Sequence, residues 1–295
     1  MLWKEITFTL SFNKLELFES HLLELGACSI TLKDAKDQPI LEPAVNETPL
    51  WDDILLTALF TEEYDLSLIL NQLSEEIKPE ALPFHTTKTY PDKDWERTWM
   101  EHFKPIKLGK RLWICPSWQK PPEPDAINIL LDPGLAFGSG SHPTTELCLR
   151  FLDENVEHNE TVLDFGCGSG ILAISAIKLG AKKAHGIDID PQAILASNEN
   201  AKKNHINQSQ YEFLLSDQKP ENLTVDLLVA NILANPLMML SKEISDYVKP
   251  CGKIALSGIL SDQADAVIKA YQPYFDLNPI QQKEEWVLIS GIKKS

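Results

Sequence analysis

The chain has 295 residues, of which 43% are hydrophobic, so it is long enough for one large or two ordinary globular domains. Its formal net charge of −16 argues against a nucleic-acid binder, because binding to phosphates needs a basic surface. A charge of this sign either attracts a basic partner or only maintains solubility.

No run of about 18 apolar residues predicts a membrane span, and the first residues do not resemble a secretory signal. The five cysteines include no C-x-x-C pair, which argues against a zinc site and against a disulfide framework. The sequence therefore predicts a cytoplasmic protein without a bound metal.

Residues 1–90 alternate between strand-like and helical patterns in the order β-α-β-β-α-β. Apolar residues recur at helical spacing over residues 14–25, and Gly26 follows as a stop. The strand-like runs are WKEITFTL, ACSITL, ILLTALF and PFHTTKTY, and DLSLILNQLSEEI predicts the second helix. This order predicts a small α+β domain of the ferredoxin-like type.

Residues 91–104 predict a short linker helix, because Trp95, Trp99 and Phe103 recur every fourth residue and share one face. That aromatic face favours packing against a neighbouring domain over recognition of a substrate. The second domain is expected to span residues 105–295.

From about residue 127, strands alternate with helices that start near Pro143, Ser169, Pro191, Pro236 and Leu260. This alternation predicts an α/β domain with a mostly parallel, Rossmann-like sheet and helices on both faces. Its seven strands are expected at INILLD, TVLDF, AHGID, YEFLL, VDLLVA, GKIALS and EEWVLIS.

The sequence TVLDFGCGSG at 161–170 predicts a strand that ends in a tight turn at the start of a helix. Gly166, Gly168 and Gly170 allow positive φ and let a ligand approach the backbone. A dinucleotide fingerprint would need its third glycine at Ile171, whereas this spacing, with Asp164 before the turn, resembles the first motif of methyltransferases that use S-adenosylmethionine (SAM). A nicotinamide or flavin nucleotide, or a turn without a ligand, remains an alternative.

Polar residues follow the ends of other strands of this domain. Asp188 ends its strand about 20 residues beyond the glycines, where a carboxylate can bind both ribose hydroxyls. Asn231 follows VDLLVA, and it is expected to bind the cofactor's polar end or a substrate amine, or else to form a local turn. Asn235 is expected to cap the next helix, which leaves Asn231 in the loop.

The segment DPGLAFGSGSHPTT at 132–145 predicts a glycine-rich loop that can fold over a ligand. Thr145 offers a hydroxyl in the first turn of the following helix, near the ligand or as an ordinary first-turn residue. His142 is a candidate general base, but a lone histidine beside a helix start is more often structural. Cys167 is expected to fill space, because no basic neighbour is evident that would lower the pKa of its thiol.

Taken together, these segments closely resemble the bacterial methyltransferases that modify ribosomal protein L11, the PrmA family, over nearly the whole chain. The segments that carry the resemblance are DKDWERTWMEHFKPIKLGKRLWICPSW, LLDPGLAFGSGSHPTTELCL, TVLDFGCGSGILAI, GIDIDPQA, VANILANPL and EEWVLISG. The resemblance implies a small substrate-recognition domain, a linker helix and a seven-stranded SAM-binding domain.

The resemblance also implies where SAM binds. Matched to the family, the cofactor lies against Thr145, Gly166, Asp188 and Asn231, and the alternating glycines extend this contact to Gly168. The loop has Ser139 and Ser141 where threonine is usual, which keeps the hydroxyls. Asn231-Ile-Leu-Ala stands in place of the Asn-Pro-Pro-aromatic motif of many amino-methylating enzymes, so the amine need not be held as it is there.

The activity implied by the resemblance is trimethylation of α-amino and lysine ε-amino groups of ribosomal protein L11. The expected reaction is an in-line displacement in which the protein mainly supplies alignment, so no catalytic base is assigned. The protein is expected to be a monomer that does not bind nucleic acid directly. A methyltransferase acting on another protein, a small molecule or nucleic acid, and a SAM-binding regulator without turnover, are the alternatives.

Overall fold

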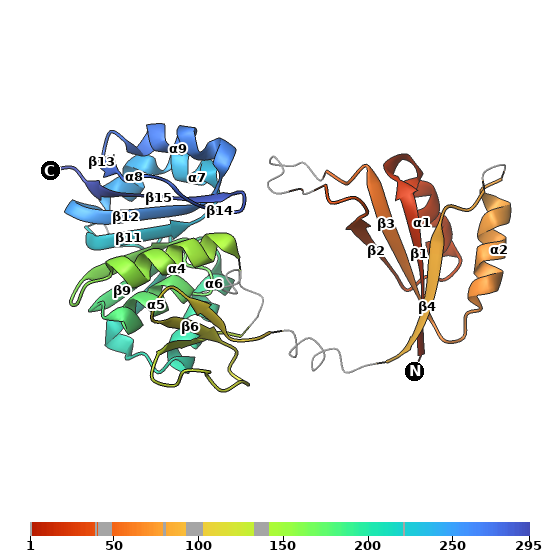
Figure 1. Ribbon diagram of the computed structural model, residues 1–295, viewed down its shortest axis with the longest axis horizontal. Helices are drawn as coiled ribbons and strands as arrows, with labels where there is room; N and C mark the ends of the chain where they lie inside the picture. Colours follow the sequence, from red (N-terminus) through yellow and green to blue (C-terminus); the bar gives the residue numbers. More distant parts are fainter. Residues whose placement is uncertain are drawn as a thin grey trace. The chain divides into compact units, whose positions relative to one another are not determined.

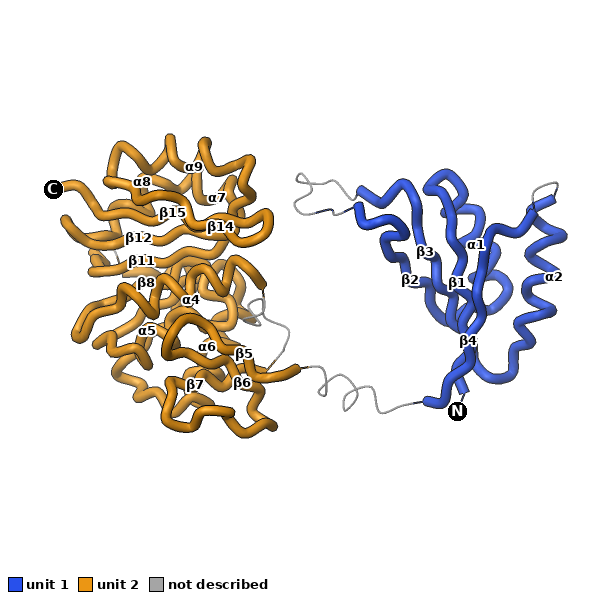
Figure 2. The backbone as a smooth tube through the Cα atoms, viewed as in Figure 1, with its two compact units in different colours: residues 1–100 blue, residues 101–295 orange. Residues whose placement is uncertain are grey.

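The computed structural model describes residues 2–38, 40, 49–78, 81–92, 103–132, 142–220 and 222–295. The chain forms two compact units, residues 1–100 and residues 101–295, which are coloured separately in Figure 2. The linker helix expected at 91–104 falls mostly on residues 93–102, which lie outside the described residues. Among the helices that are described, none combines the length and the apolar character needed to span a bilayer.

Unit 1 has the β-α-β-β-α-β order that the sequence predicts. Its elements are β1 (Leu2–Ser11), α1 (Leu15–Glu24), β2 (Ser29–Asp34), β3 (Asp53–Thr61), α2 (Leu66–Glu76) and β4 (His85–Pro91). The strands form an antiparallel sheet in the order β2-β3-β1-β4. The strands β1 and β4 are adjacent in the sheet, although they are the first and the last strand of the unit in the sequence. The sheet therefore has the interleaved topology of a ferredoxin-like fold.

One face of this sheet carries the core of unit 1. Every second residue is buried along β3 and, in β1, from Ile6 to Leu10, and these side chains pack against α1 and α2. The period of two in the strands and the apolar stripe on each helix therefore meet on the same face. The opposite face is more polar, and there the Thr7 and Thr57 hydroxyls are hydrogen-bonded at 2.9 Å.

The central sheet of unit 2 has the strand order β10-β9-β8-β11-β12-β15-β13, with β14 also paired to β15 (Figure 1). The five strands from β10 to β12 are parallel to their neighbours, whereas β15 is antiparallel to β12, β13 and β14. The strands are β8 (Thr161–Phe165), β9 (Lys183–Asp188), β10 (Tyr211–Leu215), β11 (Val225–Asn231), β12 (Val248–Leu260), β13 (Phe275–Leu277), β14 (Gln281–Lys283) and β15 (Trp286–Lys293). The order reverses at β8, where such sheets bind their ligands.

Helices cover both faces of this sheet, as the sequence predicts. The helices α4 (Pro143–Asn155), α5 (Ile171–Leu179) and α6 (Pro191–Lys203) contribute to one apolar core. The helices α7 (Ala234–Met239), α8 (Ser241–Asp246) and α9 (Ala264–Tyr271) contribute to the other, and Figure 1 shows them grouped on one side of the sheet. Pro143 and Pro191 occupy the first turns of α4 and α6, where a missing N–H group costs nothing.

One of the expected sheet strands lies elsewhere. The segment INIL forms β7 (Ile127–Leu130), which belongs to a separate three-stranded sheet with β5 (Ile106–Leu108) and β6 (Leu112–Cys115). The place of the seventh strand in the central sheet is taken by β13, which has only three residues. The prediction was wrong here because the alternating pattern gives a strand but not the sheet in which it pairs.

Side-chain hydrogen bonds attach the small sheet to the helices of unit 2. Asn204, at the end of α6, donates to Leu130 O at 2.7 Å and accepts from Leu130 N at 2.8 Å. On α4, the buried Asp153 carboxylate accepts from Arg111 Nε at 2.8 Å and from Lys110 N at 2.6 Å. These bonds satisfy backbone groups that a three-stranded sheet would otherwise leave unpaired.

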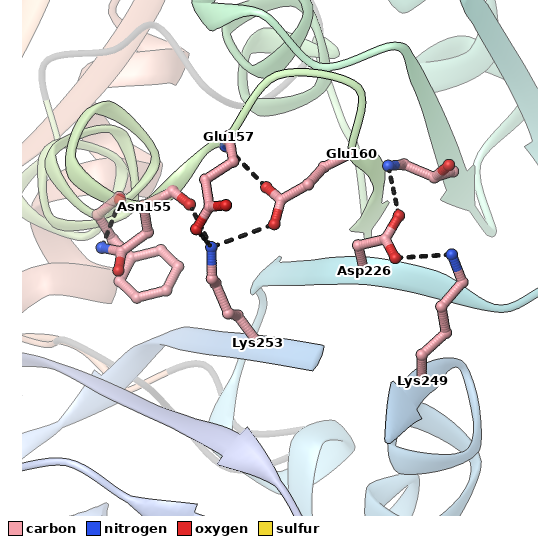
Figure 3. Close-up of polar contacts among 8 residues, drawn as sticks. Asn155, Glu157, Glu160, Asp226, Lys249 and Lys253 are labelled. Carbon is pink, nitrogen blue, oxygen red and sulfur yellow. Dashed lines mark hydrogen bonds and ion pairs between the residues drawn. The ribbon is translucent and has the colours of Figure 1, made fainter. Parts of the chain in front are cut away.

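A polar network fixes the amino ends of the central strands (Figure 3). Lys253 Nζ donates to Asn155 O and Glu157 Oε1, both at 2.8 Å, and to Glu160 Oε1 at 3.1 Å. Beside it, the Asp226 carboxylate accepts from Thr161 N at 2.8 Å and from Lys249 Nζ at 2.7 Å. The network therefore connects β12 with the loop that leads from α4 into β8.

Replacing Lys253 with methionine should lower the free energy of unfolding by about 1–3 kcal/mol, because the half-buried Asn155 O and Glu160 lose their donor. Urea denaturation followed by circular dichroism measures this change. The matched control is Lys249→Met, which removes a more exposed ion pair and should cost about 0–1 kcal/mol. An equal loss in both variants would contradict the structural role of Lys253.

Candidate functional site

The glycine turn follows directly from the end of β8. Gly166, Gly168 and Gly170 have φ values of +77°, +50° and +75°, which residues other than glycine rarely adopt. Gly166 N and Cys167 N both donate to Ile187 O, at 2.8 and 3.0 Å. The turn is therefore fixed to the neighbouring strand β9 before α5 begins.

The space beside Gly166 is closed to a side chain. A Cβ atom built there would lie 2.3 Å from Ile232 Cγ2, and one on Gly170 would lie 2.7 Å from Ser197 Cβ. The turn thus needs glycine both for its dihedral angles and for its contacts. The close packing of Ile232 and Ser197 against these glycines therefore fixes the backbone of the turn at the end of the strand.

Three of the candidate residues lie side by side at the carboxyl ends of three neighbouring strands. Phe165 of β8 pairs with Ile187 of β9 on one side and with Ala230 of β11 on the other. The next residue along each strand is Gly166, Asp188 or Asn231, respectively. Since neighbouring strands lie about 5 Å apart, the structure brings all three to the same edge of the sheet.

Asp188 is oriented by two backbone groups. Its Oδ2 accepts from Gly168 N at 2.8 Å, and its Oδ1 accepts from Asp190 N at 3.0 Å. A carboxylate has about four lone-pair positions, so about two remain for further donors. A pair of vicinal hydroxyl groups, as in a ribose, matches this remaining capacity.

Asn231 and Thr145 meet although they are 86 residues apart. Asn231 Nδ2 donates to Thr145 Oγ1 at 3.3 Å, and Thr145 is buried in the first turn of α4. The expected cap of the next helix was wrong, because α7 begins at Ala234 with Leu233 as its N-cap. Asn231 still lies outside that helix, and within the described residues its side-chain Oδ1 and second N–H form no hydrogen bond, which leaves them capacity for a ligand.

His142 has a structural role at the start of α4. It is the N-cap residue, and its Nδ1 accepts a hydrogen bond from Thr144 N at 3.3 Å. The ring also packs edge-on against Trp286, with 5.0 Å between centroids, and burial lowers the pKa of this imidazole. These contacts support a structural role for His142.

The Cys167 thiol is buried within the turn, and this burial raises its pKa. A buried thiol with a raised pKa is a poor nucleophile, which agrees with the space-filling role expected from the sequence.

The glycine-rich loop at 133–141, with Ser139 and Ser141, lies outside the described residues.

The sequence assigned no role to Asp164, which the structure places fully buried beneath the turn. Its Oδ2 accepts from Ala173 N at 3.1 Å, whereas no donor among the described residues reaches Oδ1. Burial raises the pKa of this carboxyl well above its usual range, the Ala173 hydrogen bond opposes the rise, and the charge of Asp188 adds to it. A single acid inside an apolar strand, just before a glycine turn, was the available signal.

Comparison with known proteins identifies the family. The family model described as ribosomal protein L11 methyltransferase (PrmA) matches residues 2–294. The chain belongs to this family. It is 51% identical to a ribosomal protein L11 methyltransferase of Actinobacillus pleuropneumoniae and 49% identical to one of Pseudomonas fluorescens, and each alignment covers all of both chains.

A solved structure supports the same conclusion. The chain resembles the crystal structure of a ribosomal protein L11 methylase from Lactobacillus delbrueckii subsp. bulgaricus, with 34% identity and a TM-score of 0.59. That alignment covers 65% of this chain and 100% of the other. Family membership makes the chain a SAM-dependent methyltransferase with the mixed α/β fold described above.

The residues at the edge of the sheet fit this cofactor. SAM offers no phosphate but has a ribose and an amino acid end, and the site offers free carboxylate lone pairs on Asp188 and an amide on Asn231. Thr145, Gly166, Gly168, Asp188 and Asn231 thus remain the predicted cofactor-binding residues.

Replacing Gly166 with alanine should abolish measurable SAM binding and lower the free energy of unfolding by about 1–2 kcal/mol or more, because the new Cβ meets Ile232 at a positive φ. Calorimetric titration with SAM and thermal unfolding measure the two effects. Gly180→Ala, at the other end of α5 with φ +121°, is the control, since it should destabilise the fold without changing SAM affinity. Normal SAM affinity in the Gly166 variant would contradict the site.

Replacing Asp188 with asparagine should weaken SAM binding by about 1.5–3 kcal/mol, or roughly 10- to 150-fold, since charge-assisted hydrogen bonds to the ribose are lost. Titration calorimetry at constant pH gives the affinity. Asp190→Asn changes a neighbouring acid that caps α6 by accepting from Gln192 N, so it serves as the control. An unchanged dissociation constant for the Asp188 variant would exclude the ribose assignment.

Proposed function

We propose that this protein transfers methyl groups from SAM to amino groups of ribosomal protein L11, and that it trimethylates both α-amino and lysine ε-amino groups. Two observations support the proposal. The family match extends over residues 2–294, and Gly166, Asp188 and Asn231 share one register position at the edge of the sheet. The second carries the assignment of the site, because chain segments far apart in the sequence converge there.

SAM supplies an activated methyl group, so the protein needs only to bind it and align a nucleophile. Asp188 and the glycine turn would hold the nucleoside end, and Thr145 with Asn231 would hold the other end or the incoming amine. The Thr145 hydroxyl and the Asn231 amide already orient each other at 3.3 Å. Such fixed polar groups supply the geometry that an in-line displacement requires.

The nucleophile must reach the site as a free amine. An α-amino group has a pKa of about 8 and a lysine of about 10.4, so a lysine needs the greater shift. An apolar surrounding lowers the pKa of an amine, and water can accept the proton. The exposed Leu233 and Met239, close in sequence to Asn231, would provide apolar surface for the substrate chain. We assign no catalytic base.

Unit 1 is the proposed substrate-recognition domain, and its charge supports this role. Residues 1–92 contain six lysines, no arginine and seventeen carboxylates, so they carry −11 of the net charge of −16. A basic ribosomal protein would be attracted to such a unit. The expected linker at 91–104 would let unit 1 present more than one amine to the site in turn.

The remaining proposals concern the state of the enzyme in the cell. The acidic surface of the chain supports a protein partner and no direct contact with nucleic acid. A ribosomal protein substrate supports a cytoplasmic location. We further propose that the enzyme acts as a monomer.

Incubation of the enzyme with SAM and purified ribosomal protein L11, followed by peptide mass spectrometry, tests the proposed reaction. The expected result is the mass of three added methyl groups at the amino terminus and at one or more lysines of L11. The Asp188→Asn variant, assayed at the same SAM concentration, should give much slower modification. Methyl transfer only to other components of a ribosomal extract, or no transfer at all, would overturn the proposed substrate.

A further inference from the structure

Asp164 has a hydrogen-bonding deficit that the proposed function leaves unexplained. Its side chain is fully buried, it accepts one hydrogen bond from Ala173 N, and Oδ1 has no partner among the described residues. No lysine, arginine or histidine of the described residues forms an ion pair with it. Burying an unpaired charge in this way is costly, whereas a neutral carboxylic acid can be accommodated.

One part of its role is to cap α5. The N-cap of this helix is Gly170, which has no side chain, and Asp164 accepts from the third helical residue, Ala173, in its place. An asparagine or a neutral acid would accept this bond equally well. Capping therefore accounts for Oδ2, but it does not account for an ionisable group with a free Oδ1 under the cofactor turn.

The titratable neighbours of Asp164 come from three elements. They are Cys148 of α4, Cys167 of the turn and Asp188 at the end of β9. Burial raises the pKa of both thiols, so neither adds a charge. The Asp188 carboxylate accepts two N–H groups and repels a second negative charge beneath it. A cation bound close to the turn would shift this balance toward the ionised acid.

We propose that Asp164 is a proton-linked positioning residue, which is neutral in the free protein and ionises when the cationic methyl donor occupies the crevice. The O–H bond of the carboxyl breaks, the proton passes to solvent buffer, and the carboxylate remains to offset the sulfonium charge. By linkage, a ligand that favours the ionised acid binds more tightly as the pH rises through its titration.

This inference rests on SAM as the cofactor, and it adds a means of telling donor from product. S-adenosylhomocysteine (SAH), the product, keeps the α-ammonium group of SAM but lacks the sulfonium, so it offers Asp164 one cationic centre fewer to offset. The ionised Asp164 would strengthen the binding of SAM. After methyl transfer Asp164 would take up a proton again, and this would weaken the binding of SAH. An enzyme that methylates one substrate several times needs this exchange at every cycle.

Calorimetric titration at about pH 6, in buffers of different ionisation enthalpy, counts the protons released on binding. At this pH the α-amino groups of both ligands stay protonated, since their pKa is about 8. The wild-type protein should release up to about one proton with SAM and much less with SAH. Its affinity for SAM should also rise with pH, by up to about tenfold per unit, while that for SAH stays nearly constant.

The Asp164→Asn variant keeps the acceptor for Ala173 and should release no proton with either ligand, with a flat pH profile for SAM. Asp153→Asn, which alters a buried carboxylate already paired with Arg111, is the control and should behave as the wild type. Equal proton release with SAM and SAH in the wild type, or undiminished release in the Asp164 variant, would overturn the inference.

The wild-type contrast between SAM and SAH decides the question even where the Asp164 variant does not fold. Binding of SAM without proton release overturns this inference alone and leaves the proposed function standing. Failure of SAM to bind at all overturns the cofactor assignment and the inference together.

Discussion

The site depends on the two hydrogen bonds that Ile187 O accepts from Gly166 N and Cys167 N. They continue the pairing of β8 and β9 beyond Phe165. They also hold the turn beside Asp188, the last residue of β9. The Asp188 carboxylate in turn accepts a hydrogen bond from Gly168 N. The strand, the turn and the acid therefore brace one another without any ligand, so a cofactor would meet a site that is already formed.

Polar groups at the two ends of the central strands differ in how fully they are hydrogen-bonded. At the amino ends, Lys253 and Asp226 take up backbone groups and charges, so that the polar residues there are paired with one another. At the carboxyl ends, Asn231 and Asp188 retain unused hydrogen-bonding capacity, and Asp164 has an oxygen without a donor. The unused hydrogen-bonding capacity at the carboxyl ends supports the assignment of the ligand site to that end of the strands.

Most of the elements could be predicted because their signals are local. The alternation in β1 and β3, the glycine stop after α1 and the prolines at the starts of α4 and α6 act within a few residues of themselves. Pairing is not local, and the prediction for residues 127–130 was wrong for that reason. Asn204 of α6 holds Leu130 from 74 residues away and helps keep β7 outside the central sheet.

By itself the sequence determined where the chain turns and which side chains are available there, since glycine dihedral freedom, proline at a helix start and strand periodicity are properties of short segments. Only the tertiary structure decided that Thr145 meets Asn231, that His142 packs against Trp286 and that Asp164 is buried with an oxygen unpaired among the described residues. Those outcomes depend on which strands become neighbours and on how much water is excluded between them, and both are set by contacts across tens of residues.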